Sequence, residues 1–329
     1  MTEDKIIKRV KKEKKTVRNV TNLTPQSVPA DRGNYVMTYN NKVTNAISTS
    51  FGKRKSNVQY DPISKQGRIT KITASGKIEL YLNNFNSLVS GLNVPTKKLL
   101  EMCIIKLAGQ NNYKETANLN TLIELPLKEY MELCELKDIK EARKQIMLSL
   151  NTLYELSFDA DEHINGEQIP LFRTRLCDTI GAIKNSVIIY NFSDVIASYL
   201  NQSYPMLFDT GAFKYKSNSY LFYRMMQSHY NMNKDKKNEN LLRVETLLEA
   251  SELPSYEDLP KNQGQVSLRI IQPFEKALDA IEAITWEYAG TNGKPLTKEQ
   301  MEGMYGKNGY RVFSKLNIKF TLINLKQLL

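Results

Sequence analysis

Residues 265–284 read QVSLRIIQPFEKALDAIEAI, and apolar side chains recur in this stretch every three or four positions. That spacing matches the ~3.6 residues of one α-helical turn, so these side chains share one face. The predicted buried stripe comprises Val266, Ile270, Phe274, Leu278 and Ile281. A second face carries, at the same spacing, the polar residues Gln265, Arg269, Gln272 and Lys276. The stretch predicts a long amphipathic helix, in which Pro273 should cause a kink or mark the true start.

A fixed order of elements surrounds this helix. Upstream, residues 217–232 have a helical pattern, residues 241–244 form a short strand, and residues 244–253 form a short helix. Downstream, residues 285–288 are extended, and a Gly-rich connection leads to a last strand at residues 317–325. The order is therefore helix, strand, short helix, long helix and strands.

The same order occurs earlier in the chain. Pro95 precedes an amphipathic helix that runs to Leu107, and a short strand follows at residues 122–125. Two consecutive helices are predicted at residues 126–136 and 138–156, with Asp138 as the N-cap of the second. Extended runs then follow at residues 156–159, 169–176 and 187–190. The second helix should bury Ile139, Ile146, Leu150 and Leu153, and its N-terminal end carries the basic residues Lys137, Lys140, Arg143 and Lys144.

This twofold order is typical of the winged helix, a helix-turn-helix followed by a β-wing. In that fold the short helix braces the longer one, whose outer face is free to enter a DNA major groove, while a hairpin lies along the phosphates. We therefore predict an α+β protein with two tandem winged-helix domains, at residues 78–203 and 204–329. No residue-level repeat accompanies this duplication of architecture, and a helix pair with strands is common in other α+β proteins.

Positive charge is concentrated at the start of the chain. Residues 1–77 contain 17 Lys and Arg against 5 Asp and Glu, whereas the whole chain of 329 residues has a net charge of +11. We expect residues 1–33 to form a disordered basic arm, which either attracts polyanions or serves as a solvated tail. Residues 34–77 should form a basic, partly ordered extension, with a hairpin signal where residues 68–73 and 77–82 flank Ala-Ser-Gly.

The residues that metal or nucleotide chemistry requires are missing from the sequence. His163 and His229 stand alone, which excludes a His-hydrophobe-His metal site. The three scattered cysteines, Cys103, Cys134 and Cys177, are predicted to be reduced core residues. No GxxxxGK[ST] string occurs, and the glycine-containing stretch 303–309 has the wrong spacing and is interpreted as a turn. We expect no cofactor, no metal and no enzymatic activity.

Membrane insertion is not expected either. Apolar runs such as Val187–Tyr190 are far shorter than the roughly 18 to 20 residues of a bilayer-spanning helix. The first residues lack the apolar region of a secretory signal. The expected location is the cytoplasm.

The polar faces of the two long helices carry side chains suited to DNA. Arginine pairs with guanine, glutamine with adenine, and lysine with phosphate. The candidate contacts are Gln265, Arg269, Gln272 and Lys276 on the second helix, Lys137, Lys140, Arg143 and Lys144 on the first, and Lys53, Arg54 and Lys55 in the extension. For either helix alone, a solvated basic face explains these residues equally well. Two such helices at equivalent positions favour sequence-recognising DNA binding.

With these stretches in hand, the chain resembles the theta-type plasmid replication initiators, which bind iterons through two winged-helix domains. The resemblance covers about residues 78–329 and rests on LPLKEY at 125–130, EARK at 141–144 and VSLRIIQPFEKAL at 266–278. It implies a protein that binds repeated origin DNA, helps to melt adjacent A+T-rich DNA and recruits host helicase and primase machinery. It also implies homodimers that repress their own promoter. Two features depart from the family pattern, namely the long N-terminal segment and Pro273.

Two other functions compete with that of an initiator. A winged-helix transcriptional regulator or partition protein would make the same DNA contacts without recruiting replication proteins. A nickase, relaxase or recombinase is disfavoured by the missing metal and nucleophile constellations, although the chain has 18 tyrosines.

Overall fold

A computed structural model describes residues 35–40, 42–49, 58–63, 66–73, 76–82, 92–111, 119–164, 167–183, 186–259, 264–290, 293–305 and 309–323. The predicted arm at residues 1–33 and the basic cluster Lys53, Arg54 and Lys55 lie outside the described residues. The chain divides into two units. Unit 1 comprises residues 1–47 and 56–214, and unit 2 comprises residues 48–55 and 215–329.

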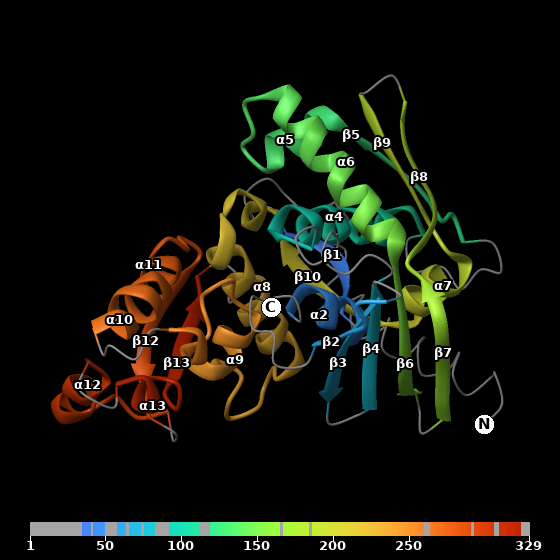
Figure 1. The fold of residues 1–329 in the computed structure, drawn as a ribbon. Helices are drawn as coiled ribbons and strands as arrows, with labels where there is room; N and C mark the ends of the chain where they lie inside the picture. Colours follow the sequence, from blue (N-terminus) through green and yellow to red (C-terminus); the bar gives the residue numbers. More distant parts are fainter. Residues whose placement is uncertain are drawn as a thin grey trace. The chain divides into compact units, whose positions relative to one another are not determined.

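Unit 1 contains a winged helix. Its helix-turn-helix elements follow in the predicted order, as α4 (Val94–Asn111), β5 (Leu122–Pro126), α5 (Leu127–Leu133) and α6 (Ile139–Glu155). The wing is the hairpin of β8 (Cys177–Ile183) and β9 (Val187–Phe192), which extends alongside α6 in Figure 1. These strands form an antiparallel sheet of order β5-β9-β8.

A second sheet in unit 1 has the order β2-β3-β4-β6-β7. Its strands are β2 (Val58–Tyr60), β3 (Gly67–Thr73), β4 (Gly76–Leu82), β6 (Leu156–Ile164) and β7 (Glu167–Arg175). The predicted hairpin around Ala-Ser-Gly is present as β3 and β4, with Thr73 opposite Gly76. Of the two strands that directly follow α6, β6 pairs with β4 and β7 pairs with β6, so the wing is formed by the next hairpin.

A strand pair that the sequence analysis did not anticipate lies near the start of the described chain. β1 (Tyr35–Asn40) pairs antiparallel with β10 (Tyr204–Asp209), so Tyr35 lies opposite Asp209. The helices α2 (Lys42–Thr49) and α7 (Asp194–Gln202) follow β1 and precede β10, and a 3₁₀ turn, η2 (Thr210–Lys214), ends unit 1.

Helix α4 is buried along most of its length, including at the charged residues Lys97, Lys98 and Glu101. Asn93 caps its start by accepting the backbone N–H of Thr96 at 3.2 Å, and Pro95 occupies the first turn, where a missing N–H costs nothing. Lys98 donates from Nζ to the backbone oxygen of Phe213 at 2.5 Å. Glu101 accepts the hydroxyl of Thr38 on β1 at 2.7 Å. A buried charge requires a polar partner. These two hydrogen bonds provide that partner for Lys98 and Glu101, and they also attach α4 to η2 and β1.

Unit 2 repeats the winged-helix order. Its elements are α8 (Ser217–Met232), β11 (Leu241–Arg243), α9 (Val244–Ala250), the 3₁₀ turn η3 (Tyr256–Asp258), α10 (Gly264–Val266), the π-turn η4 (Ser267–Ile271), α11 (Gln272–Asp279), β12 (Ile284–Ala289) and β13 (Asn317–Leu322). The sheet order β11-β13-β12 matches that of β5-β9-β8, since in both sheets the strand before the helix pair adjoins the last strand. The predicted α+β class with two tandem winged helices is confirmed.

The expected Gly-rich connection before the last strand is partly helical. It contains α12 (Lys298–Tyr305) and α13 (Gly309–Phe313). A Cβ atom on Gly309 would lie 2.3 Å from the backbone oxygen of Met304, so glycine is required for this close approach.

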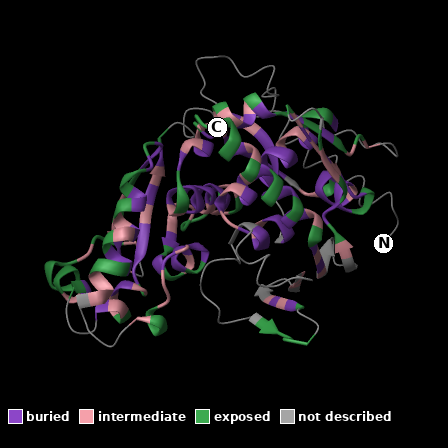
Figure 2. Cartoon of the chain, turned by 45° about the horizontal axis from the view of Figure 1, so that its top comes forward, coloured by how far each residue is buried: buried purple, intermediate pink, exposed green. Residues whose placement is uncertain are grey.

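Buried side chains fill the interior of each unit, while exposed residues gather on the outer faces of helices (Figure 2). Cys103, Cys134 and Cys177 are buried and free, as predicted. Burial raises the pKa of the Cys134 thiol to about 11 and that of Cys177 to about 12, which keeps these thiols protonated at neutral pH.

Candidate nucleic-acid interface

Helix α6 begins as its sequence predicts. The Asp138 carboxylate accepts the backbone N–H groups of Lys140 at 2.7 Å and Glu141 at 3.1 Å, which satisfies two of the free donors at the helix start. The helix packs against α4 through a buried face that includes Ile146, Leu150 and Leu153. Its polar side is therefore directed away from the core.

The candidate residues of unit 1 lie on that outer side. Lys137, Lys140 and Lys144 are exposed, and Arg143 is half-buried. Ile139 was predicted to be a core residue, and this prediction is wrong, since 46% of its surface is exposed. It is the first residue of α6, whereas the buried face begins at Ala142, so nothing in the core covers it.

The second long helix has an irregular hydrogen-bonding pattern around Pro273. The backbone N–H of Gln272 donates to the oxygen of Ser267, five residues earlier, as in a π-turn. Pro273 has no N–H and occupies the first turn of α11, where none is needed. The helix thus passes the proline with a change of winding and ends at Asp279, before the predicted end at Ile284.

The amphipathic division of this helix agrees with the prediction at most positions. Ile270, Phe274, Leu278 and Ile281 are buried. Val266, predicted in the same stripe, is only half-buried because the π-turn that follows it changes the phase of the helix. On the other face, Arg269, Gln272 and Lys276 are exposed and Gln265 is half-buried. Their roles in DNA contact remain predictions.

Two carboxylates of α11 accept hydrogen bonds from aromatic residues of β12 and α12, which we call the wing region. Glu275 Oε1 accepts the hydroxyls of Tyr288 at 3.1 Å and Tyr305 at 2.7 Å. Asp279 Oδ1 accepts the indole N–H of Trp286 at 3.0 Å. Burial and the hydrogen bond to Glu275 raise the pKa of Tyr305 to about 12. These contacts span up to 30 residues and have no local sequence signal, which is why the sequence analysis missed them.

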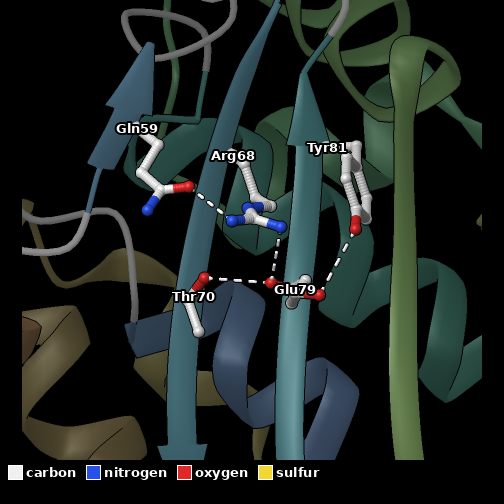
Figure 3. A network of polar contacts seen from close by, with 5 residues as sticks. All are labelled: Gln59, Arg68, Thr70, Glu79 and Tyr81. Carbon is white, nitrogen blue, oxygen red and sulfur yellow. Dashed lines mark hydrogen bonds and ion pairs between the residues drawn. The ribbon is translucent and has the colours of Figure 1, made fainter.

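The basic extension contributes a charge-paired sheet surface. Figure 3 shows Arg68 of β3 between Gln59 and Glu79, with Arg68 Nη1 lying 3.2 Å from Glu79 Oε1. Thr70 and Tyr81 donate their hydroxyls to the two oxygens of the same carboxylate, each at 3.3 Å. Glu79 therefore offsets the charge of Arg68 locally.

Both ring nitrogens of His229 have hydrogen-bond partners in the structure. Its Nε2 lies 2.9 Å from the backbone oxygen of Asn238, and its Nδ1 lies 3.3 Å from Asn233 Nδ2. A neutral ring with the proton on Nε2 donates to the first group and accepts from the second. Burial lowers the pKa of His229, which favours this neutral form.

Two further findings concern the part of the chain that the structure describes. No group of three or more His, Cys, Asp or Glu side chains is arranged to hold a metal ion. None of the described helices combines the length and apolarity that a bilayer crossing requires.

The two sheets of identical order, each with a helix pair before its wing, define a protein built from tandem winged-helix units. Residues 78–214 match the family described as "Initiator Replication protein, WH1". The match ends at Lys214, the last residue of unit 1. The match agrees with the resemblance over these residues, and unit 1 contains the WH1 domain of that family.

Solved structures of domains 2 and 3 of RctB are similar to the chain in architecture. One structure, of selenomethionine derivatives, aligns with 85% of this chain and with 98% of the RctB chain, at a TM-score of 0.44 and 10% sequence identity. The other structure, of residues 155–483 of RctB, aligns with 84% of this chain and with 96% of the RctB chain, at a TM-score of 0.43 and 10% sequence identity. No curated protein sequence matches the chain.

Proposed function

We propose that this protein is a replication initiator that binds repeated duplex sequences at an origin through both of its winged-helix units. The observation that carries the proposal is the equivalent position of two long helices, α6 and α10–η4–α11, each with an exposed polar face before a wing. A helix in this position enters the major groove, where Arg269 and Gln272 have the donors and acceptors that read guanine and adenine. Lys140, Lys144 and Lys276 would hold phosphates.

The electrostatic arrangement of unit 2 supports this orientation. Glu275 and Asp279 accept hydrogen bonds from aromatic residues of β12 and α12, which fix these carboxylates but leave their negative charge. Arg269 and Lys276 are exposed and supply the cations of this helix. A polyanion would therefore be attracted at Arg269 and Lys276.

Origin opening would draw on binding energy from both units. Bending or unstacking DNA costs a few kcal/mol, which additional contacts from a second unit can offset. The opened DNA would then be passed to a host helicase or primase, and the initiator itself would cleave no strand. A homodimer that represses its own promoter is part of the same proposal.

The proposal is tested by comparing Arg269→Ala with Lys236→Ala. Both changes remove one positive charge from unit 2, but Lys236 lies in the turn between α8 and β11. Binding is measured by fluorescence anisotropy on a duplex selected from a random pool and on its scrambled version. Arg269→Ala should lose about 1–3 kcal/mol on the selected duplex and far less on the scrambled one, and Lys236→Ala should lose little on either. An equal loss on both duplexes would argue against base readout.

A second assay separates an initiator from a regulator or a nickase. A supercoiled plasmid that carries repeats of the selected duplex beside an A+T-rich tract is treated with permanganate, which modifies unpaired thymine. An initiator makes the tract reactive, whereas a regulator binds without opening it. Nicked circles in Mg²⁺ or Mn²⁺ that disappear on a Tyr→Phe change would replace the proposal with a nickase or recombinase.

A further inference from the structure

Leu268 is an exposed apolar side chain on the face proposed to read DNA. It lies in the π-turn η4 with 63% of its surface exposed. It shares the outer face of the helix with Gln265, three residues before it, and Gln272, four residues after it. The buried stripe that begins at Ile270 lies on another face, so the core does not explain this leucine.

A single exposed leucine on a protein surface needs no explanation, but the same feature recurs in unit 1. On α6, Met147 and Leu148 are 44% and 46% exposed. They follow Lys144 by three and four residues and therefore lie beside it on the helix surface. Each of the two candidate DNA-reading helices thus combines an exposed apolar group with neighbouring cations and polar side chains.

The charge around Leu268 indicates which partner this apolar group meets. Arg269 follows it directly, and Lys276 lies two turns further along the exposed face. Glu275 and Asp279 are hydrogen-bonded to Tyr288, Tyr305 and Trp286. An apolar side chain with a cation directly beside it complements a polyanion that carries local apolar groups. In a DNA major groove the apolar group is the C5 methyl of thymine.

We propose that Leu268 is a specificity-determining residue that contacts the C5 methyl group of a thymine in the recognised duplex. The inference rests on the proposed function, since it requires this helix to enter the major groove. Gln272 has the amide that suits adenine N6 and N7, so the two side chains together select an A·T-containing step. Arg269 beside them suits guanine.

The experiment removes the methyl group from the DNA and the side chain from the protein, separately and together. A recognised duplex is first selected from a random pool with the full chain. Each thymine in it is then replaced singly by deoxyuridine, which keeps base pairing and removes only the methyl. Affinities are measured for the wild type, Leu268→Ala and Leu268→Gln. Met232→Ala serves as the matched control, because Met232 is 52% exposed on α8 of the same unit.

The expected result is a position where deoxyuridine weakens wild-type binding about fourfold, the factor that corresponds to about 0.8 kcal/mol for one methyl-sized group. Leu268→Ala and Leu268→Gln should bind the thymine duplex more weakly and lose this sensitivity at that position only. Met232→Ala should keep it. Thermal melting should be unchanged in the Leu268 variants because the side chain is exposed.

Other outcomes separate the inference from the function on which it rests. If the wild type binds every deoxyuridine duplex equally well, or if the Leu268 variants keep the same penalty, the methyl contact is overturned while duplex recognition stands. If Leu268→Ala changes only sedimentation behaviour, the leucine is part of an interface between copies of the chain, and the inference is overturned. If selection yields no preferred duplex, the proposed function itself has failed.

Discussion

Replacing Glu275 by alanine should loosen the attachment of the wing region to the DNA-reading helix of unit 2. The change removes one carboxylate oxygen that accepts two hydroxyls, from Tyr288 at 3.1 Å and Tyr305 at 2.7 Å. Hydrogen bonds to a charged group contribute about 1.5–3 kcal/mol when buried. Tyr288 is half-buried and should contribute about 2 kcal/mol, whereas Tyr305 is 52% exposed and should contribute about 0.5 kcal/mol. The expected loss is about 2–3 kcal/mol.

The chain provides its own probe for this measurement. Trp286 is the single tryptophan, and its ring centroid lies 5.2 Å from that of Tyr288. Its fluorescence during urea unfolding therefore reports on unit 2. With a slope of about 1–3 kcal/mol per molar urea, the midpoint should fall by about 1 M.

Matched variants divide this loss between the two hydroxyls. Tyr288→Phe should reproduce most of the effect, Tyr305→Phe only a small part, and Glu275→Gln less than Glu275→Ala because the amide oxygen still accepts. A midpoint for Glu275→Ala within about 0.2 M of the wild type would refute the reasoning, since it would mean that both hydroxyls find equivalent partners in water.

Three further predictions use the same protein. Gly309→Ala should destabilise unit 2 by about 1–3 kcal/mol in the tryptophan assay, because its Cβ would lie 2.3 Å from Met304 O, whereas Gly303→Ala, with no atom within 4 Å, should not. Burial lowers the pKa of His229, so this side chain takes up a proton less readily in the folded state than in the unfolded state. The free energy of unfolding should therefore be constant above about pH 6.5 and fall as the pH drops below it. His229→Gln should flatten this dependence. Deleting residues 1–33 should reduce the slope of log affinity against log salt and leave the preferred duplex unchanged, and an unchanged slope would identify the segment as a solvated tail.

Local patterns in the sequence were sufficient for the elements that build the two winged helices. The helical period predicted α8 at residues 217–232, and the Asp138 N-cap predicted the start of α6, because both depend on neighbours within one or two turns. The hairpin of β3 and β4 was predicted by its Ala-Ser-Gly turn for the same reason. Helical phase also predicted that most candidate residues of the two long helices reach the surface, since burial on one side of a helix exposes the other, although Arg143 and Gln265 are half-buried.

Contacts between distant parts of the chain required the tertiary structure. β1 pairs with β10 across more than 160 residues, and the β6–β7 hairpin joins the sheet of β4 rather than the wing. A strand carries no mark of its partner, because any edge of matching length and polarity satisfies its backbone hydrogen bonds. The buried pair of Thr38 and Glu101 depends on such pairing.

At the candidate site, the sequence determined the chemistry and the tertiary structure decided the arrangement. The order of Gln265, Arg269, Gln272 and Lys276 follows from the helical repeat. The π-turn ahead of Pro273, the half-burial of Val266 and the bonds from Tyr288 and Tyr305 to Glu275 do not. They arise because a proline without an N–H must be accommodated within a packed helix, and because a carboxylate takes its partners from whichever element the fold brings close.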